Sequence, residues 1–345
     1  MQRLRAVVLL IGLTGLWACG PDGPEAAREG FIPLAAGGRL YYRLSGVGHD
    51  TIVVLHGGPG LHGRYLDDVV APLASGHVFI IYDQRGRGRS DFPRDTLDLS
   101  AAADVADLDV VRTYFHLDRP TLIGHGWGAG LAALYAMRYP ERVGRLLLIS
   151  PMVPRANHLF NLTFQHAVGI DTSALDDLMT ARIAGRDRSD PVGFCRRYWG
   201  AFLSPAVVRD RMVIRRLESS VCDAPPTALL HVELINRRVL GSLGAWNWPP
   251  QLTALQIPTL VIQGGESAPG DRDESLTWLA SAMDWTSSLP DARLLRVGNT
   301  PQFPWLDAGD RFLSPVEEFL DGRWPREARA VSPADSLHGP VSARD

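Results

Sequence analysis

The segment TLIGHGWGAGLAALYAMR, residues 121–138, joins a short apolar run to an Ala- and Leu-rich stretch through the glycine-rich turn Gly124–Gly128. The run Thr121–Ile123 predicts a buried strand, and Ala129–Arg138, which ends ahead of Pro140, predicts a helix. A strand, a glycine-rich turn and a helix in this order are typical of α/β folds, in which the turn lies at the carboxyl end of a parallel strand. The segment therefore predicts one strand–turn–helix unit of a parallel sheet.

Similar units lie on both sides of this segment. From Phe31 onward, short β-rich apolar runs alternate with helical stretches, and a further helix is expected at Arg311–Leu320. Near-continuous Ile, Val and Leu runs fit strands that are covered on both faces, so we expect a mostly parallel central sheet flanked by helices. The other expected strands are Leu40–Leu44, Thr51–Leu55, His77–Tyr82, Arg145–Ile149, Thr259–Ile262 and Arg293–Val297.

The pattern changes between Pro151 and Pro250, where strand signals stop and amphipathic helical stretches rich in Arg, Trp and Leu follow. We interpret residues 151–250 as a helical cap inserted between strands 6 and 7, over the strand ends where open α/β sheets bind ligands. The α/β core then comprises residues 31–150 and 251–322. Residues 323–345 are charged, contain proline and lack periodicity, so we expect a disordered tail.

The N-terminal residues 1–18 have the pattern of a bacterial export signal, with a short basic start and an apolar run too short to span a bilayer. Leu16–Cys19 resembles a lipoprotein cleavage box and predicts a lipid on Cys19, hence an exported protein anchored to a membrane on its extracytoplasmic side. A plain secretory signal or an uncleaved anchor is the alternative. Residues 19–30, rich in Pro, Gly and Ala, are expected to be a tether.

The chain has three cysteines, so a lipid on Cys19 would leave Cys195 and Cys222. In an oxidising compartment this pair favours a disulfide, although two buried free thiols are the alternative. The formal charge of −3 has no basic stripe behind it, which argues against nucleic acid as a partner. The sequence has neither an HExxH motif nor a Cys/His cluster, and no metal or cofactor is expected.

Three glycine-rich motifs follow predicted strands: HGGPG at His56–Gly60, DQRGRGRS at Asp83–Ser90 and GHGWG at Gly124–Gly128. Together they resemble the proline iminopeptidases and their relatives in the α/β-hydrolase superfamily, over roughly residues 31–320 and only weakly in the cap. The resemblance implies an α/β-hydrolase fold and a pocket beneath the cap. The DQRG run is expected to brace that pocket through Asp83 and Arg85, because guanidinium groups suit fixed pairing.

The resemblance also implies an oxyanion hole and a Ser-Asp-His triad. The hole would be made of backbone N–H groups from Gly57, Gly58 and Trp127. At the triad positions the chain has other residues: Gly126 for the nucleophile, Ser267 for the acid, and Gln302 for the base, in a register fixed by Phe-Pro-Trp at 303–305. Glycine has no attacking atom, serine no charge and an amide no pKa near neutrality, so the triad is degenerate.

Four other side chains are candidates for ligand binding. His56 and His125 flank the glycine-rich turns, although organising the turn and packing are the alternatives for them. Glu233 lies in a cap stretch that loosely resembles the helix where proline iminopeptidases place a carboxylate for the substrate amine, and an exposed helical Glu is the alternative. Glu266 precedes Ser267, where solvated loop charge is the alternative.

We therefore interpret the chain as an exported pseudoenzyme that binds a small molecule or peptide in the capped pocket, without a cofactor. The first alternative is a hydrolase or lyase of amino-acid, peptide or ester substrates that uses the oxyanion hole and displaced residues. The second is an interaction protein that uses the outer surface of the fold.

Overall fold

The computed structural model describes residues 28–156, 172–202, 211–265, 274–298, 300 and 302–332. The predictions for Cys19, Glu266 and Ser267, for the signal segment 1–18 and for residues 333–345 lie outside the described residues. Within the described part of the chain, no helix has both the length and the apolar character needed to cross a membrane.

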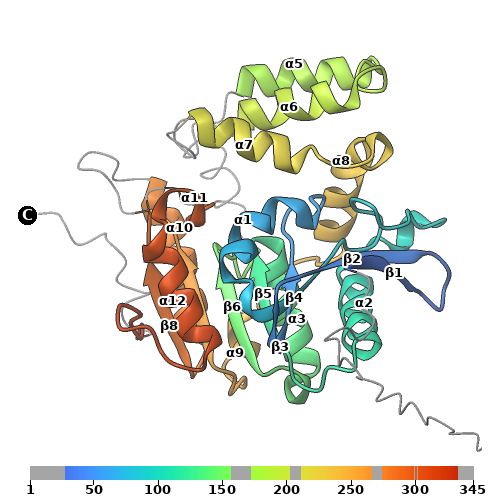
Figure 1. Cartoon of the computed structure of the whole chain (residues 1–345). Coiled ribbons are helices and arrows are strands. Elements are labelled where there is room, and N and C mark those ends of the chain that lie inside the picture. Colours follow the sequence, from blue (N-terminus) through green and yellow to red (C-terminus); the bar gives the residue numbers. More distant parts are fainter. Residues whose placement is uncertain are drawn as a thin grey trace, which may run out of the picture.

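An eight-stranded sheet forms the centre of the protein (Figure 1). Its spatial order is β1-β2-β4-β3-β5-β6-β7-β8; the β1–β2 and β2–β4 pairs are antiparallel and the other pairs are parallel. The expected mostly parallel sheet is confirmed. The strands are β1 (Glu29–Pro33), β2 (Arg39–Ser45), β3 (Val47–Leu55), β4 (Ser75–Tyr82), β5 (Thr121–His125), β6 (Arg145–Ile149), β7 (Thr259–Gln263) and β8 (Ala292–Arg296).

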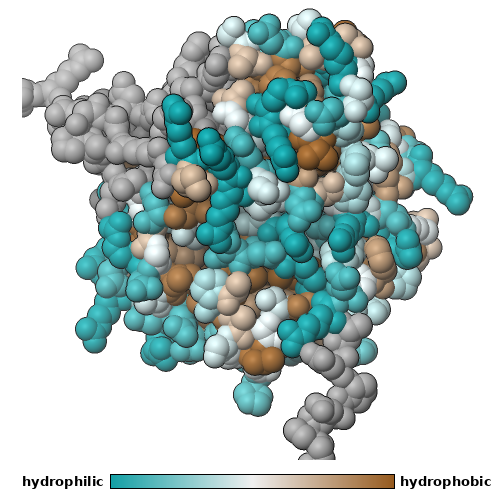
Figure 2. All heavy atoms as spheres, turned by 45° about the horizontal axis from the view of Figure 1, so that its top comes forward, coloured by the Kyte–Doolittle hydropathy of each residue, from teal (hydrophilic) through white to brown (hydrophobic). Residues whose placement is uncertain are grey.

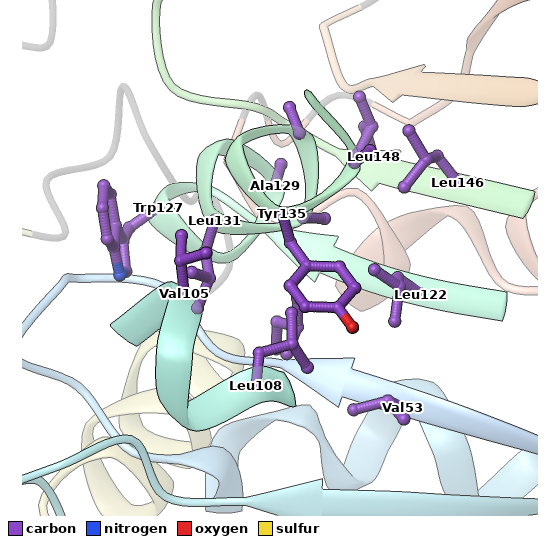
Figure 3. Packing of buried hydrophobic residues seen from close by; sticks show 14 of the residues in the cluster. Val53, Val105, Leu108, Leu122, Trp127, Ala129, Leu131, Tyr135, Leu146 and Leu148 are labelled. Carbon is purple, nitrogen blue, oxygen red and sulfur yellow. The ribbon is translucent and has the colours of Figure 1, made fainter. Parts of the chain in front are cut away.

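Helices cover both faces of the sheet, and each face has its own buried core. Successive strand residues point to opposite faces, so Val53 and Leu122 belong to one core while Val54 and Ile123 belong to the other. Figure 3 shows the first core, where Tyr135 and its neighbours pack on the sheet. This core includes α2 (Ala101–Tyr114), α3 (Trp127–Arg138) and α10 (Glu274–Ser288), and the second includes α1 (Asp67–Val70), α11 (Trp305–Ala308) and α12 (Asp310–Leu320).

The described parts of the chain between β6 and β7 consist mainly of helices, the pattern that the sequence predicts for residues 151–250. Its helices are α5 (Thr172–Ile183), α6 (Pro191–Phe202), α7 (Arg211–Val221), α8 (Pro226–Gly241) and the short α9 (Pro249–Leu252). Helices α5 to α7 lie together at one end of the molecule, and α8 lies between them and the sheet (Figure 1). We call α5–α8 the cap. A disulfide joins Cys195 of α6 to Cys222, which follows α7.

The N-terminal boundary of the core differs from the prediction. Strand β1 begins at Glu29, inside the predicted tether 19–30, and pairs with β2 from Glu29↔Arg43 to Pro33↔Arg39. Only Ile32 of the strand is fully buried, so EGFIP carries almost no alternating pattern by which to recognise it.

The prediction of a disordered tail is wrong for residues 323–332. The ring of Trp324 lies 5.3 Å from that of Phe319 in α12, and Ala328 is buried. Arg329 exchanges two backbone hydrogen bonds with Leu294 of β8, of 2.7 and 2.9 Å. This segment therefore covers the open edge of the sheet, which a sequence pattern without periodicity did not indicate.

Candidate functional site

Gly126 forms the turn between β5 and α3. Its backbone has φ 56° and ψ −114°, its N–H donates to the Ile149 carbonyl at 3.1 Å, and its carbonyl accepts from Ala129 at 3.2 Å. A positive φ favours glycine. The nearest described heavy atom to a Cβ placed there would be Gly57 Cα, at 3.9 Å. The turn therefore has room for a side chain, and only its backbone conformation favours glycine.

The outer glycines of GHGWG have a different role. A Cβ on Gly128 would overlap the Leu55 carbonyl of β3, and one on Gly124 would overlap the backbone of α3. Because these contacts are with backbone atoms, the two glycines allow the close approach of strand and helix. The motif thus holds Gly126 in place through its neighbours.

His56 organises the HGGPG turn from inside the protein. It is fully buried; its Nε2 accepts from the Gln84 N–H at 3.0 Å, and its Nδ1 lies 3.1 Å from the Gly57 carbonyl. Burial lowers the pKa of His56 well below its ordinary value. The Gln84 side chain donates to the His56 carbonyl and accepts from the Trp127 indole N–H. Both ring nitrogens of His56 are therefore engaged within the protein, which argues against its candidacy as a ligand-binding residue.

The three predicted oxyanion donors are not equivalent. The Gly57 N–H donates to the Tyr65 hydroxyl at 2.8 Å and is thus used inside the protein. The Gly58 and Trp127 N–H groups donate to no group in the described part of the chain, and Gly58 is exposed. Trp127 opens α3, where the first amides of a helix have no intrahelical acceptor. Gly58 and Trp127 are therefore the donors that can meet a ligand.

A hydrogen-bond chain joins the three loops around Gly126. The Tyr65 hydroxyl lies 2.6 Å from His125 Nδ1, and His125 Nε2 lies 2.8 Å from the Gln302 carbonyl. A carbonyl only accepts, so Nε2 carries the proton, Nδ1 accepts from Tyr65, and the Tyr65 oxygen accepts from Gly57. Burial lowers the pKa of His125 to about 4. His125 is therefore neutral near pH 7 with both ring nitrogens engaged.

Gln302 lies beside His125, where the resemblance places the base. Phe303 and Trp305 pack against the His125 ring at centroid distances of 5.3 and 5.0 Å, which anchors the loop next to Gly126. The side chain of Gln302 is half-buried. The acid position, Ser267, and the neighbouring Glu266 lie outside the described residues.

The DQRGRGRS loop braces the site by fixed pairs. Asp83 accepts from the Gly63 and Arg89 backbone amides, each at 2.8 Å, and Arg85 makes a bidentate pair with Asp107 of α2. The sequence reasoning overlooked a second pair. Arg87 and Asp104 are fully buried and joined at 2.7 and 2.8 Å, and Arg87 Nε also donates to the Pro59 carbonyl. The alternation of Arg85 and Arg87, with acids three residues apart on α2, was the available signal.

Glu233 lies on α8 with its side chain 42% exposed, and its nearest charge partner among the described residues is Arg182 of α5, at 3.9 Å. Another α8 residue, Asn236, hydrogen-bonds to the HGGPG turn: its Oδ1 accepts from the Gly60 N–H at 2.7 Å. The sequence did not single out Asn236. Among the described residues, no group of three His, Cys, Asp or Glu side chains is arranged to hold a metal ion.

Comparisons with known proteins agree with this geometry. A family model described as the alpha/beta hydrolase fold matches residues 50–307. A proline iminopeptidase of Levilactobacillus brevis is 38% identical over 257 residues, which cover 69% of this chain and 80% of that protein. The proline iminopeptidase of Heyndrickxia coagulans is 37% identical over 124 residues, so this match covers 36% of the chain and less than half, 43%, of that relative.

Solved structures give the same picture of the fold. The crystal structure of a proline iminopeptidase from Mycobacterium smegmatis has a TM-score of 0.62 and 22% sequence identity, and the match covers 85% of this chain and 98% of that one. The crystal structure of VinJ has a TM-score of 0.64 at 20% identity and covers 86% of this chain and 99% of that one. At these identities the likeness concerns the fold alone.

Proposed function

The chain belongs to the α/β-hydrolase fold family and is proline iminopeptidase-like, and from this membership we propose that it is a non-hydrolytic member of the family, which binds a small-molecule or peptide ligand beneath its cap. The observation that carries the proposal is Gly126, the single residue between β5 and α3. The nucleophile of the family occupies this turn, and glycine offers no atom to attack a carbonyl.

Neighbouring residues support the proposal because they either cannot accept a proton or already hydrogen-bond within the protein. Gln302 stands where the resemblance implies the base, and an amide cannot accept a proton near neutrality. His125, the nearest imidazole, has both ring nitrogens in the chain from Tyr65 to Gln302. The Asp83 carboxylate is held by two backbone amides. These positions argue against the competing hypothesis of a hydrolase or lyase that works through displaced residues.

The ligand-binding part of the site does not depend on the triad. The Gly58 and Trp127 amides donate to no group in the described part of the chain, and the N-terminus of α3 adds a partial positive charge at Trp127. We infer that the ligand presents a carbonyl or carboxylate oxygen to these amides. Without a triad, such a site retains about 10³–10⁴-fold catalysis over water, against about 10⁶-fold or more for an enzyme.

The cellular setting is part of the same proposal. The export pattern of residues 1–18 supports a lipid-anchored protein held by Cys19 outside the cytoplasm. The disulfide between Cys195 and Cys222 is compatible with an oxidising compartment. Radiolabelled palmitate incorporation by the full chain, compared with a Cys19→Ser variant, tests this part; incorporation that persists in the variant would contradict it.

A thermal-shift screen of amino acids, proline-containing peptides and acyl esters tests ligand binding. A binder at 100 times its Kd stabilises the folded state by about 2.7 kcal/mol. We expect Gly126→Ala to keep this shift and Gly126→Leu to lose it, because both introduce the same backbone strain while only leucine fills the space beside Gly57. Equal shifts in both variants would place the ligand elsewhere.

Turnover is measured with p-nitrophenyl esters and proline-β-naphthylamide. The proposal predicts rates no more than about 10³–10⁴-fold above the uncatalysed background, the residual level of a site without a triad. Sustained turnover that disappears in a His125→Ala variant would support the hydrolase or lyase hypothesis instead.

The outer surface offers less support for an interaction protein. With the cap side turned forward, Figure 2 shows a largely hydrophilic described surface on which apolar side chains form separate patches. The most exposed large apolar side chains of the cap are Ile183 of α5 and Met212 of α7.

A further inference from the structure

The cap is attached directly to the turn that carries Gly58. On one side of that turn, the Gly60 N–H donates to Asn236 of α8. On the other, His62 Nε2 lies 3.0 Å from the Val221 carbonyl at the end of α7, and the His62 side chain is buried. His62 Nδ1 accepts from the Arg64 N–H at 3.4 Å, so Nε2 carries the proton and donates to Val221.

The acceptor of this hydrogen bond lies next to the disulfide. Val221 is the last residue of α7, and Cys222 follows it and is bonded to Cys195 of α6. An exposed ion pair lies beside this contact, with Arg64 Nε 3.1 Å from Asp223 Oδ2. The disulfide is therefore one residue away from the carbonyl that holds His62.

Close packing leaves little space for the contact between the end of α7 and the HGGPG turn to rearrange. Gly60, Leu61 and His62 from the turn face Cys195 and Val221 from the cap across a void of only about 10 Å³. A void of this size is at the lower limit for one water molecule, so a shift of α7 is not readily compensated by solvent. Movement of Val221 is thus transmitted to the HGGPG turn.

We propose that the Cys195–Cys222 disulfide is a redox-controlled lock on the HGGPG turn. When it is formed, it holds the end of α7 so that Val221 fixes His62, and His62 fixes the turn that presents the Gly58 amide. A small dithiol breaks the S–S bond by thiol exchange; Cys195 and Cys222 become thiols, and the dithiol is oxidised to its own disulfide. The lock rests on the proposed function, because the turn matters as part of the ligand site.

Both cysteines are buried, with 8% of Cys195 and 4% of Cys222 exposed, so a reductant must approach through the surface that Cys222 lines. Cys222 lines an open cleft of about 670 Å³ between the cap and the core, together with Arg64, Arg196 and Arg216. The ligand site would therefore be fully ordered only after the chain reaches an oxidising compartment.

Hydrogen exchange of the full chain, followed by mass spectrometry with and without dithiothreitol, tests the lock without requiring a ligand. We expect reduction to speed the exchange of amides in residues 57–66 by about fivefold or more, the equivalent of about one net hydrogen bond. Amides of β6 should be unchanged. A Cys195→Ser/Cys222→Ser variant should show the reduced pattern without dithiothreitol.

His62 variants identify the path. With His62→Ala, exchange in residues 57–66 should be fast in both redox states; with His62→Gln, which can still donate to Val221, the response to reduction should return. His77→Ala removes another buried histidine and should leave the redox response as in the wild type.

Two results would overturn the lock. In the first, reduction speeds exchange in α6 and α7 but leaves residues 57–66 unchanged. In the second, β6 exchanges faster to the same extent as the turn, which would make the disulfide a general stabiliser. A failed ligand screen would instead count against the proposed function, so the two failures can be told apart.

Discussion

The substitution Gly126→Ala isolates the backbone strain of the turn. Gly126 has φ 56° and ψ −114°, a conformation that is costly for any residue with a Cβ. A Cβ there has 3.9 Å of clearance to Gly57 Cα, so overlap adds nothing to the cost. We therefore expect the substitution to lower the free energy of unfolding by strain alone, about 1–3 kcal/mol.

Two other glycines provide matched controls. Gly309, before α12, has nearly the same backbone angles, φ 53° and ψ −128°, and no described heavy atom lies within 4 Å of the position that a methyl group would take, so Gly309→Ala should cost a similar amount. Gly128→Ala would push a methyl group into the Leu55 carbonyl and should cost clearly more.

The assay is thermal unfolding of the three variants beside the wild type. A loss of about 1–3 kcal/mol corresponds to a midpoint lower by about 1–4 °C for a chain of this size. The reasoning is refuted if Gly126→Ala matches the wild type while Gly309→Ala is destabilised, or if Gly126→Ala loses as much as Gly128→Ala.

Three further predictions concern the groups around the turn. The pKa of His125 is about 4 in the folded protein, below its ordinary 6.5, so the unfolded chain binds more protons between these two pH values. The free energy of unfolding therefore falls as the pH falls from 6.5 to 4, by up to about 3 kcal/mol. His125→Asn should reduce the pH dependence of stability in urea denaturation across pH 4–7, while buried His56, whose pKa is also lowered, keeps part of it; an unchanged slope contradicts this. Tyr65→Phe leaves the Gly57 N–H and His125 Nδ1 without partners and should lower the free energy of unfolding by about 2–4 kcal/mol. The control Tyr82→Phe removes a buried hydroxyl that has no hydrogen-bond partner in the described part of the chain, so it should cost almost nothing. Equal unfolding midpoints for the two variants would refute this. Asp104→Asn leaves the buried charge of Arg87 unpaired and should lower the free energy of unfolding by about 3–5 kcal/mol in chemical denaturation. The control Asp91→Asn breaks an exposed pair with Arg39 and should have little effect. Similar losses for the two variants would contradict a structural role for the buried Arg87–Asp104 pair.

Much of the sheet could be predicted from sequence because its strands are buried on both faces. β2 to β8 were all expected, and β6 was placed at its observed bounds, Arg145–Ile149. The two segments that were missed, β1 and residues 323–332, lie at the edges of the sheet. There only one or two residues are buried, Ile32 in β1 and Pro325 and Ala328 in the tail segment, which is too few for a recognisable sequence pattern.

Only those residues of the site that lie in recognisable sequence motifs could be predicted. Gly126 and Gln302 were found from local sequence, because a glycine-rich turn and a Phe-Pro-Trp anchor fix their positions. Tyr65, His62 and Asn236 were not found, because their partners are 60, 159 and 176 residues away in the chain. Such pairs depend on the fold and leave no local signal.

The proposal that the chain has no serine nucleophile is tested most directly by intact-mass spectrometry of the full chain after treatment with a fluorophosphonate. We predict that the mass of the wild-type protein is unchanged at probe concentrations that fully modify an active serine hydrolase. A stoichiometric single adduct on any serine of this chain would show that a nucleophile is present and would contradict the account.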